Sequence, residues 1–437
     1  MSVKALENRK LDAFSLAALL VSAHYGLGFL FGTAEKALTL GIAGSLYAVS
    51  ISVGTIAAMG LAKFYWTEVD QIWTLLGNRY GNLVKILIGL LIWSSLIGIE
   101  AVQMISGAFI LKVLGLPVLP SMVGLAILFT FISLLPVEEA SWIFQTLLAL
   151  NFLALLYALW VLHGFSDYLR SPLEFIPSLQ RVSPPDFLGI SVSTILLVLI
   201  DMKCQQFIVQ TKDVRNVYFG SVLAAIVIFL IALLPSVVVI AAQQAEILPI
   251  GIDGKETIPF ILSWIGGGTD KPLGIILILS LLVPALGVGS SVLRVQNKTI
   301  LDFGILPVFN KNQWLVAVIN AFLALVIALK GSGSLIGLIV SFYAVYLAAV
   351  FVPFIAYIVA QTGHYIFSNM GVRLSLSMGS ISALSMLIVT LFNPTFVIFS
   401  RVELSIMAMG VGFGLLGLFV GQIIDKYFLL SQVREEV

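Results

Sequence analysis

Apolar segments long enough to cross a lipid bilayer recur along almost the whole chain of 437 residues. The hydrocarbon core of a bilayer is about 30 Å thick, which an α-helix of about 20 residues can span. Only 10% of the residues are charged, against about 25% in an ordinary soluble domain. The sequence therefore predicts an all-α membrane protein in which residues 1–437 form a single polytopic membrane domain.

Glycines, prolines and clusters of charge divide the apolar sequence into about twelve expected transmembrane helices. The expected spans cover residues 12–38, 41–62, 83–111, 119–136, 141–164, 187–210, 217–243, 272–301, 313–330, 334–362, 374–393 and 402–430. Residues 165–186 and 244–271 are expected to be polar connections, and the stretch TIPFILSWI at 257–265 resembles a short helix at the surface.

The distribution of positive charges indicates which side of the membrane holds the termini. With the N-terminus inside, fifteen Lys and Arg residues fall on the cytoplasmic side and eight on the other, so we expect both termini to be cytoplasmic and the protein to be integral to the plasma (inner) membrane.

The single cysteine, Cys204, excludes an intramolecular disulfide framework. ATPase and metalloprotease signatures are absent, and a net charge of +1 gives no indication of a nucleic-acid partner. We expect no enzymatic activity.

A few ionisable side chains fall inside the expected spans, where a charge costs several kcal/mol and marks a candidate functional site. These residues are His24, Glu35, Glu100, Asp201, Lys203, Arg294 and Lys298. Structural interpretations remain open: Glu35 could snorkel at the end of its helix, His24 could bond a neighbouring helix, and Lys298 could anchor at the interface.

Three glycines follow His24 in the first span, at Gly26, Gly28 and Gly32. Missing side chains either let another helix approach closely or let the helix unwind beside a cavity. The spacing alone leaves both interpretations open.

Several segments resemble the sodium/solute symporter family, in order and spacing, over roughly residues 15–330. They are GFLFGTAEKALTLGIAGSLYAVSISVG (28–54), TEVDQIWTLLGNRYG (67–81) and QQFIVQTKDVRNVYFG (205–220), with weaker similarity at SWIFQ (141–145) and LDFG (301–304).

The resemblance implies a LeuT-like fold of the amino acid-polyamine-organocation type. Its two inverted five-helix repeats would occupy residues 12–164 and 187–330, the second extending to 362, and two additional helices would occupy 374–430. The implied function is secondary active transport, in which alternating access imports a small polar or organic solute. The expected partners are this solute and the lipid bilayer; the sequence does not indicate a protein partner.

The resemblance also implies a site at mid-membrane, between the discontinuous first helices of the two repeats. It places His24, Gly28 and Phe29 beside the substrate, and Asp201 just past the unwound part of the sixth span. Glu35, further along the first span, is a fifth candidate substrate-binding residue.

In the family, a coupling sodium ion is held by backbone carbonyls of the first helix and hydroxyls of the eighth. The carbonyl positions correspond to Ser22 and Tyr25. The hydroxyl pair corresponds to Leu286 and Gly287, whose side chains carry no oxygen. Sodium is a hard cation that prefers oxygen ligands, so this departure leaves sodium coupling open.

Two replacements for the lost hydroxyl pair remain open. Ser290 and Ser291, one turn further on, could supply ion-binding hydroxyls. Alternatively, Lys203 or Arg294 could substitute for the ion as a fixed cation.

A proton is the other candidate coupling ion, carried at His24, Glu35 or Asp201. Without any coupling, the chain would be an uncoupled transporter of the same fold, or a transporter-like membrane sensor or accessory subunit. No cofactor beyond a sodium ion or a proton is expected.

Overall fold

The computed structural model describes residues 9, 11–68, 71–135, 137–303, 312–330, 333–363, 365–393 and 395–435; the side chains of 137–148, 202, 203, 206, 302, 303 and 428–435 lie outside this description. Every regular element in the described ranges is a helix, and strand pairing is limited to two isolated bridges. This confirms the predicted all-α class. The chain divides into two compact units, residues 1–67 with 96–339 and residues 68–95 with 340–437, and each is considered by itself.

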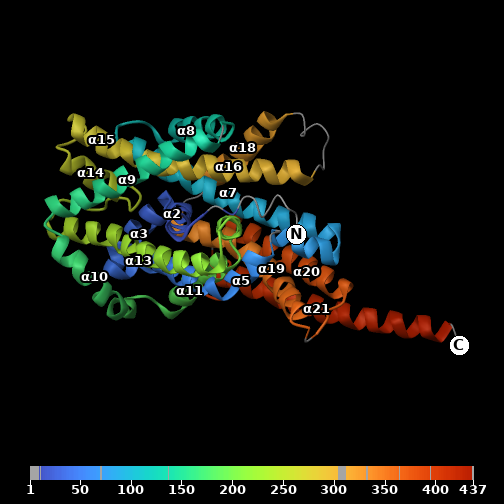
Figure 1. Ribbon diagram of the computed structural model, residues 1–437. Helices are drawn as coiled ribbons and strands as arrows, with labels where there is room; N and C mark the ends of the chain where they lie inside the picture. The colour runs from blue at the N-terminus through green and yellow to red at the C-terminus, as the bar shows by residue number, and fades with distance from the viewer. Residues whose placement is uncertain are drawn as a thin grey trace. The chain divides into compact units, whose positions relative to one another are not determined.

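The first unit contains most of the helices (Figure 1). They are α2 (Ala13–His24), α3 (Leu27–Leu40), η1 (Gly41–Ser45), α4 (Leu46–Ala57), α5 (Met59–Thr67), α8 (Val118–Ser133), α9 (Val137–Val161), α10 (Phe165–Ser178), η2 (Leu179–Arg181), α11 (Pro184–Leu199), α12 (Met202–Val209), α13 (Val214–Gln244), α14 (Thr257–Ile265), α15 (Pro272–Ser280), α16 (Leu282–Phe303) and α18 (Gln313–Lys330). Helices α7 (Asn82–Val113) and α19 (Leu335–Gln361) have residues in both units. The second unit adds α6 (Ile72–Tyr80), α20 (Asn369–Phe392) and α21 (Val402–Glu435).

Length and composition identify eight described helices that can cross a membrane, plus the pair α9 and α10, which are bent by 105° at their junction. Three shorter apolar helices are Ala13–His24, Val118–Ser133 and Pro184–Leu199. Together, the eight long helices, the bent pair and the three shorter helices agree roughly with the twelve predicted spans. The agreement arises because hydropathy is a property of each segment, independent of its neighbours.

Helix starts are encoded locally by capping side chains. Asp12 Oδ1 accepts from the Ser15 amide at 2.8 Å at the start of α2. Asp213 accepts from the Asn216 amide at 2.7 Å at the start of α13. Because the first amides of a helix have no partner within the helix, these carboxylates fix where each helix begins.

Within the first unit, α13 packs along α2, α3 and α4, and α11 packs on α4. Helices α8, α16 and α18 form a second packed group (Figure 1). Their outer surfaces are apolar: Ile127 and Phe131 of α8 are 53% and 57% exposed, and Phe322 of α18 is 61% exposed. Such apolar surface is suited to contact with lipid.

The second unit is held by close packing of α20 on α21. A Cβ added at Gly421 of α21 would lie 2.4 Å from Gly371 Cα of α20, and one at Gly417 would lie 2.6 Å from the Leu374 carbonyl oxygen. Small residues at helix contacts of this kind allow backbones to approach closely in a membrane.

The two polar connections contain more helix than the sequence suggested. TIPFILSWI forms the helix α14 as predicted, but six of its nine residues are buried, so it does not lie at the surface. Residues 165–186, however, are not simply a connection, because they include α10 and η2. Charged Asp167, Arg170 and Glu174 lower the hydropathy of α10, while apolar residues at helical spacing still form one face of it.

Candidate substrate site at two helix breaks

The first predicted span is broken between α2 and α3, with Tyr25 and Gly26 outside both. The Gly26 amide donates to the His24 carbonyl at 3.0 Å. In a continuous α-helix it would donate to the carbonyl of Ser22. The break therefore removes the Ser22 carbonyl from the helical ladder. This geometry is compatible with the predicted ion-binding role of that carbonyl.

Gln103 of α7 supports this break from a distant part of the chain. Its Oε1 accepts from the Leu27 amide at 3.2 Å, and its side chain is 1% exposed. Leu27 is the first residue of α3, so its amide has no helical partner. Gln103 was not predicted from the sequence, because an uncharged amide side chain in a membrane span does not stand out as a charged one does.

Tyr25 and Phe29 form a buried aromatic pair beside the break. Their ring centroids are 5.6 Å apart, and each side chain is 3% exposed. The Tyr25 hydroxyl donates to Asn151 Oδ1 of α9 at 2.8 Å. This bond ties the break to the fifth predicted span.

The glycines of α3 have different roles. Gly26 is the residue before α3, with φ −112° and ψ 179°, and it belongs to the break. A Cβ added at Gly28 would lie 2.2 Å from Ile339 Cδ1, and one at Gly32 would lie 2.6 Å from Ile336 Cγ1. Gly28 and Gly32 are therefore packing positions against the start of α19 and lie inside a helix.

A second break separates α11 from α12, with Ile200 and Asp201 between them. The Tyr65 hydroxyl of α5 donates to the Leu199 carbonyl at 2.6 Å and thus supplies a partner for the end of α11. The Cys204 amide donates to the Asp201 carbonyl at 3.1 Å and begins α12. Asp201 is 7% exposed and Cys204 is 4% exposed.

The two breaks meet, because α12 packs against α2. His24 Nε2 lies 3.3 Å from Cys204 Sγ. One ligand atom each from His24, Asp201 and Cys204 lie within 4.8 Å of one another. The structure thus brings together two of the five predicted substrate-site residues, His24 and Asp201, and adds Cys204. The role of Cys204 was not predicted, because a single cysteine in a sequence indicates only that no intramolecular disulfide forms.

Glu35 lies in a different environment. Its Oε2 accepts from the Leu335 amide at 3.2 Å, at the first turn of α19, and its side chain lies beside Gly254. Nine residues of α3 separate it from Gly26, or about 14 Å along a helix. The carboxylate is placed to stabilise the positive end of the α19 dipole.

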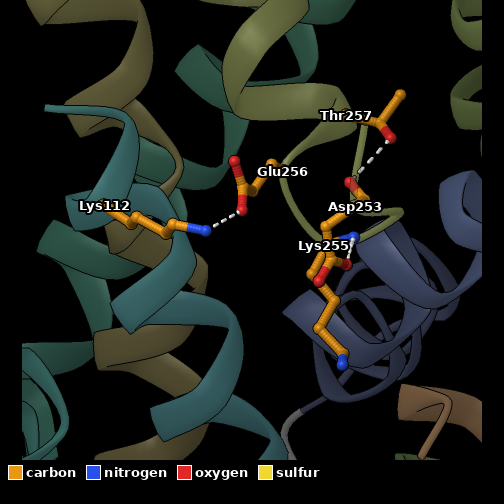
Figure 2. A network of polar contacts seen from close by, with 5 residues as sticks. All are labelled: Lys112, Asp253, Lys255, Glu256 and Thr257. Carbon is orange, nitrogen blue, oxygen red and sulfur yellow. Dashed lines mark hydrogen bonds and ion pairs between the residues drawn. The ribbon is translucent and has the colours of Figure 1, made fainter. Parts of the chain in front are cut away.

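The loop around Gly254 carries its own polar network (Figure 2). Lys112 of α7 forms an ion pair with Glu256. The Lys255 amide donates to Asp253 Oδ1 at 2.9 Å, and Thr257 Oγ1 donates to the Asp253 carbonyl at 3.4 Å. These bonds shape the turn that precedes α14 and hold it to the end of α7.

The predicted ion-binding serines lie on α16. Ser290 is 2% exposed, and its Oγ donates to the Gly287 carbonyl at 3.4 Å. Ser291 Oγ donates to the Val288 carbonyl at 2.9 Å, and this side chain is exposed. A Cβ added at Gly26 would lie 3.2 Å from Val288 Cγ2, so this part of α16 does lie against the first break.

Arg294 binds the end of another helix. Its Nε donates to the Ser133 carbonyl at 3.0 Å, and one terminal nitrogen donates to those of Leu135 and Ile132 at 2.8 and 3.2 Å. These carbonyls lie at the C-terminus of α8, where a cation is favourable. The other predicted cation, Lys203, has a side chain outside the described residues.

A second buried polar group connects α7 to α16. Glu100 and Gln296 are both 0% exposed. With the Gln296 amide oriented to satisfy both of its ends, its nitrogen donates to Glu100 Oε2 at 2.8 Å and its oxygen accepts from the Ile97 amide at 3.2 Å. Glu100 Oε1 has no hydrogen-bond partner among the described residues. Glu100 lies one helical turn from Gln103, which supports the first break.

No family model and no curated protein matches the sequence. Solved structures do match the fold. The chain is similar to a Na+-coupled sialic acid symporter in a substrate-bound outward-open state (14% identity, TM-score 0.55, covering 96% of each chain). It is also similar to Mhp1, a nucleobase-cation-symport-1 family transporter in a closed conformation with bromovinylhydantoin bound (14% identity, TM-score 0.58, covering 97% of this chain and 94% of that chain).

A third similar structure is a manganese transporter of Eremococcus coleocola in complex with an aromatic bis-isothiourea substituted compound (16% identity, TM-score 0.50, covering 95% of this chain and 94% of that chain). All three are LeuT-fold transporters. The chain therefore has the LeuT fold of membrane transporters, as the resemblance of its motifs implied.

Proposed function

We propose that this protein is a secondary active transporter resembling the sodium/solute symporters, which imports a small polar solute by alternating access. The observation that carries the proposal is the meeting of two helix breaks, which brings His24 of the first together with Asp201 and Cys204 of the second. Discontinuous helices expose backbone and polar side chains at mid-membrane, where transporters bind their substrates. The structural neighbours transport or bind chemically different ligands, so the fold does not select the solute.

We also propose that a proton, rather than sodium, is the coupling ion. Leu286 and Gly287 offer no side-chain oxygen, and Ser291 is exposed. With the Ser22 and Tyr25 carbonyls, Ser290 would give a sodium site three protein oxygens, fewer than the about six that a hard cation takes.

Glu100 is the described carboxyl group best suited to carry the proton. It is fully buried, and its partner is the neutral amide of Gln296. A buried carboxylate without a cation costs several kcal/mol, whereas the protonated acid costs far less. Movement that exposed Glu100 to water would let the proton leave, and this would couple protonation to the conformational change.

The test is reconstitution into proteoliposomes. A thermal-shift screen first selects solutes that stabilise the purified protein; their uptake is then measured with a sodium or a proton gradient imposed separately. We expect accumulation with the proton gradient. Glu100→Gln should abolish gradient-driven accumulation while exchange of solute across the membrane persists. Glu174→Gln, at an exposed carboxylate of α10, is the control that should retain both.

Three results would count against parts of this proposal. Sodium-driven accumulation that Ser290→Ala abolishes would identify sodium as the coupling ion. Accumulation unchanged in Glu100→Gln would remove that residue from the coupling step. Absence of uptake for every stabilising solute, with or without gradients, would reject transport itself.

Both termini are proposed to be cytoplasmic in the plasma membrane. In a Cys204→Ser background, an impermeant thiol reagent applied to intact cells should label Asp270→Cys and leave Asn312→Cys unlabelled. The opposite pattern would invert the topology.

A further inference from the structure

We propose that the solute bound between the two helix breaks is a divalent transition-metal cation, held by His24, Asp201 and Cys204. This inference rests on the proposed transport function for its identification of the ion as cargo. The binding site itself is argued from the three side chains and does not depend on transport.

The ligand set is mixed in a way that selects the metal class. An imidazole, a carboxylate and a thiol together suit zinc and neighbouring first-row metals, whereas magnesium and calcium prefer sites made of oxygen alone. Cys204 in particular would disfavour the hard cations. A divalent transition metal is therefore the best chemical match to this cluster.

The distances are close to those of a formed site. Zinc–nitrogen and zinc–sulfur bonds of about 2.0 and 2.3 Å in a tetrahedron separate the two ligand atoms by about 3.5 Å. His24 Nε2 and Cys204 Sγ are 3.3 Å apart. Since no pair of ligand atoms is more than 4.8 Å apart, a movement of at most about 1.5 Å would bring the carboxylate to ligand spacing.

Charge and burial support a cation of this valence. Asp201 and Cys204 are 7% and 4% exposed. With Cys204 as thiolate, the two side chains carry two negative charges, which a divalent cation neutralises while neutral His24 completes the set. Binding would release the thiol proton to water. Three protein ligands leave a further position open to water, as in metal sites that exchange their ligands.

The placement of the ligands connects binding to conformational change. His24 is the last residue of α2, while Asp201 and Cys204 lie at the junction of α11 with α12. The metal would bridge the two breaks, and any relative movement of α2 and α12 would change its coordination. The ion would be released when α2 and α12 move apart, because its ligands come from both helices.

The first experiment measures metal binding to the purified, tag-free protein in nanodiscs. We expect one Co2+ per chain, with a near-ultraviolet charge-transfer band that reports a cobalt–thiolate bond, and displacement of the cobalt by Zn2+. Excess Mg2+ should not displace it. His24→Gln, Asp201→Asn and Cys204→Ser should each weaken binding about tenfold or more, and Cys204→Ser should also remove the band.

His163 supplies a matched control, because it is an exposed histidine far along the chain from the cluster. His163→Gln should bind Co2+ as the unmodified protein does. Binding that is unchanged in both Cys204→Ser and His24→Gln would overturn the proposal. A folded protein, verified by its melting transition, that binds no Co2+ or Zn2+ would also overturn it.

A second measurement uses the fact that Cys204 is the only cysteine of the sequence. Alkylation by a small maleimide in membranes should slow when Zn2+ is present and should be unaffected by Mg2+. In His24→Gln the protection by Zn2+ should fall. Equal protection in the unmodified protein and in His24→Gln would contradict a shared site.

Uptake of Zn2+ into proteoliposomes, followed with an internal fluorescent chelator, separates the two proposals. Cluster-dependent binding with no uptake would keep the metal site and reject the transport function. Uptake of another solute by a protein that binds no transition metal would keep the transport function and reject the metal site.

Discussion

The two helix breaks differ in how their unpaired backbone groups are satisfied. At the first break, the amide side chain of Gln103 accepts from the backbone of α3, and that of Asn151 accepts from the Tyr25 hydroxyl. At the second, the Tyr65 hydroxyl donates to the end of α11 and Asp201 begins α12. The first break is thus anchored by other helices. The second break carries Asp201 and Cys204, two of the three clustered ligands. Its backbone is anchored by the Tyr65 hydroxyl, whereas its metal ligands are the Asp201 carboxylate and the Cys204 thiol.

The largest loss of stability is expected from removing the Gln103 side chain that bonds the first helix break. Gln103→Leu would leave the buried Leu27 amide without a partner, which costs about 1–3 kcal/mol. Denaturant or thermal unfolding in detergent measures the loss. Gln243→Leu is the matched control, since Gln243 donates to the Leu38 carbonyl at an exposed position, and it should change stability by less than about 0.5 kcal/mol. Equal losses in both variants would contradict a special role for Gln103.

A smaller effect is expected at the second break. Tyr65→Phe removes the hydroxyl that bonds the Leu199 carbonyl, at a cost of about 0.5–1.5 kcal/mol. The ligands of the cluster remain, so Co2+ binding should persist with an altered affinity. Tyr65→Phe keeps the ring and its contact with Phe64, so the variant isolates the effect of the hydroxyl. Complete loss of Co2+ binding in a folded Tyr65→Phe protein would show that anchoring and chemistry are not separable.

The Tyr25 hydroxyl provides a comparison within the first break. Tyr25→Phe keeps the aromatic pair with Phe29 but leaves Asn151 Oδ1 without its donor. We expect a loss of about 1 kcal/mol and little change in metal binding, because Tyr25 contributes no side-chain ligand to the cluster. If Tyr25→Phe weakened Co2+ binding more than Tyr65→Phe does, the first break would be the more closely connected to the metal site, contrary to this comparison.

The smallest effect concerns the start of α2, which carries His24 at its other end. The bond from the Ser15 amide holds the pKa of Asp12 below its ordinary value. The stabilisation from this carboxylate is therefore present above about pH 4 and is lost as pH falls through the lower folded-state pKa. Asp12→Ala should lower the melting temperature slightly at neutral pH and remove this part of its acid dependence. An identical melting difference at pH 7 and pH 3 would contradict the assignment.

The candidate site was predicted only in part. His24 and Asp201 stood out because ionisable residues are costly in a span, and the structure places both at the breaks. Glu35 stood out for the same reason, yet its carboxylate bonds the first turn of α19, away from both breaks. Gln103, Asn151 and Cys204 gave no comparable signal, since uncharged side chains are tolerated in membrane helices.

The sequence by itself determined the all-α class and the approximate number of membrane spans, because the bilayer tests each segment for length and hydropathy independently of the rest. The resemblance of its motifs to the sodium/solute symporters implied a discontinuity in the first and sixth spans. Only the tertiary structure decided that the break lies at Tyr25 and Gly26, while Gly28 and Gly32 pack against α19. It also decided that His24 faces Cys204, 180 residues away. Such meetings depend on the rotation and packing of helices against one another, which hydropathy along a single segment does not specify.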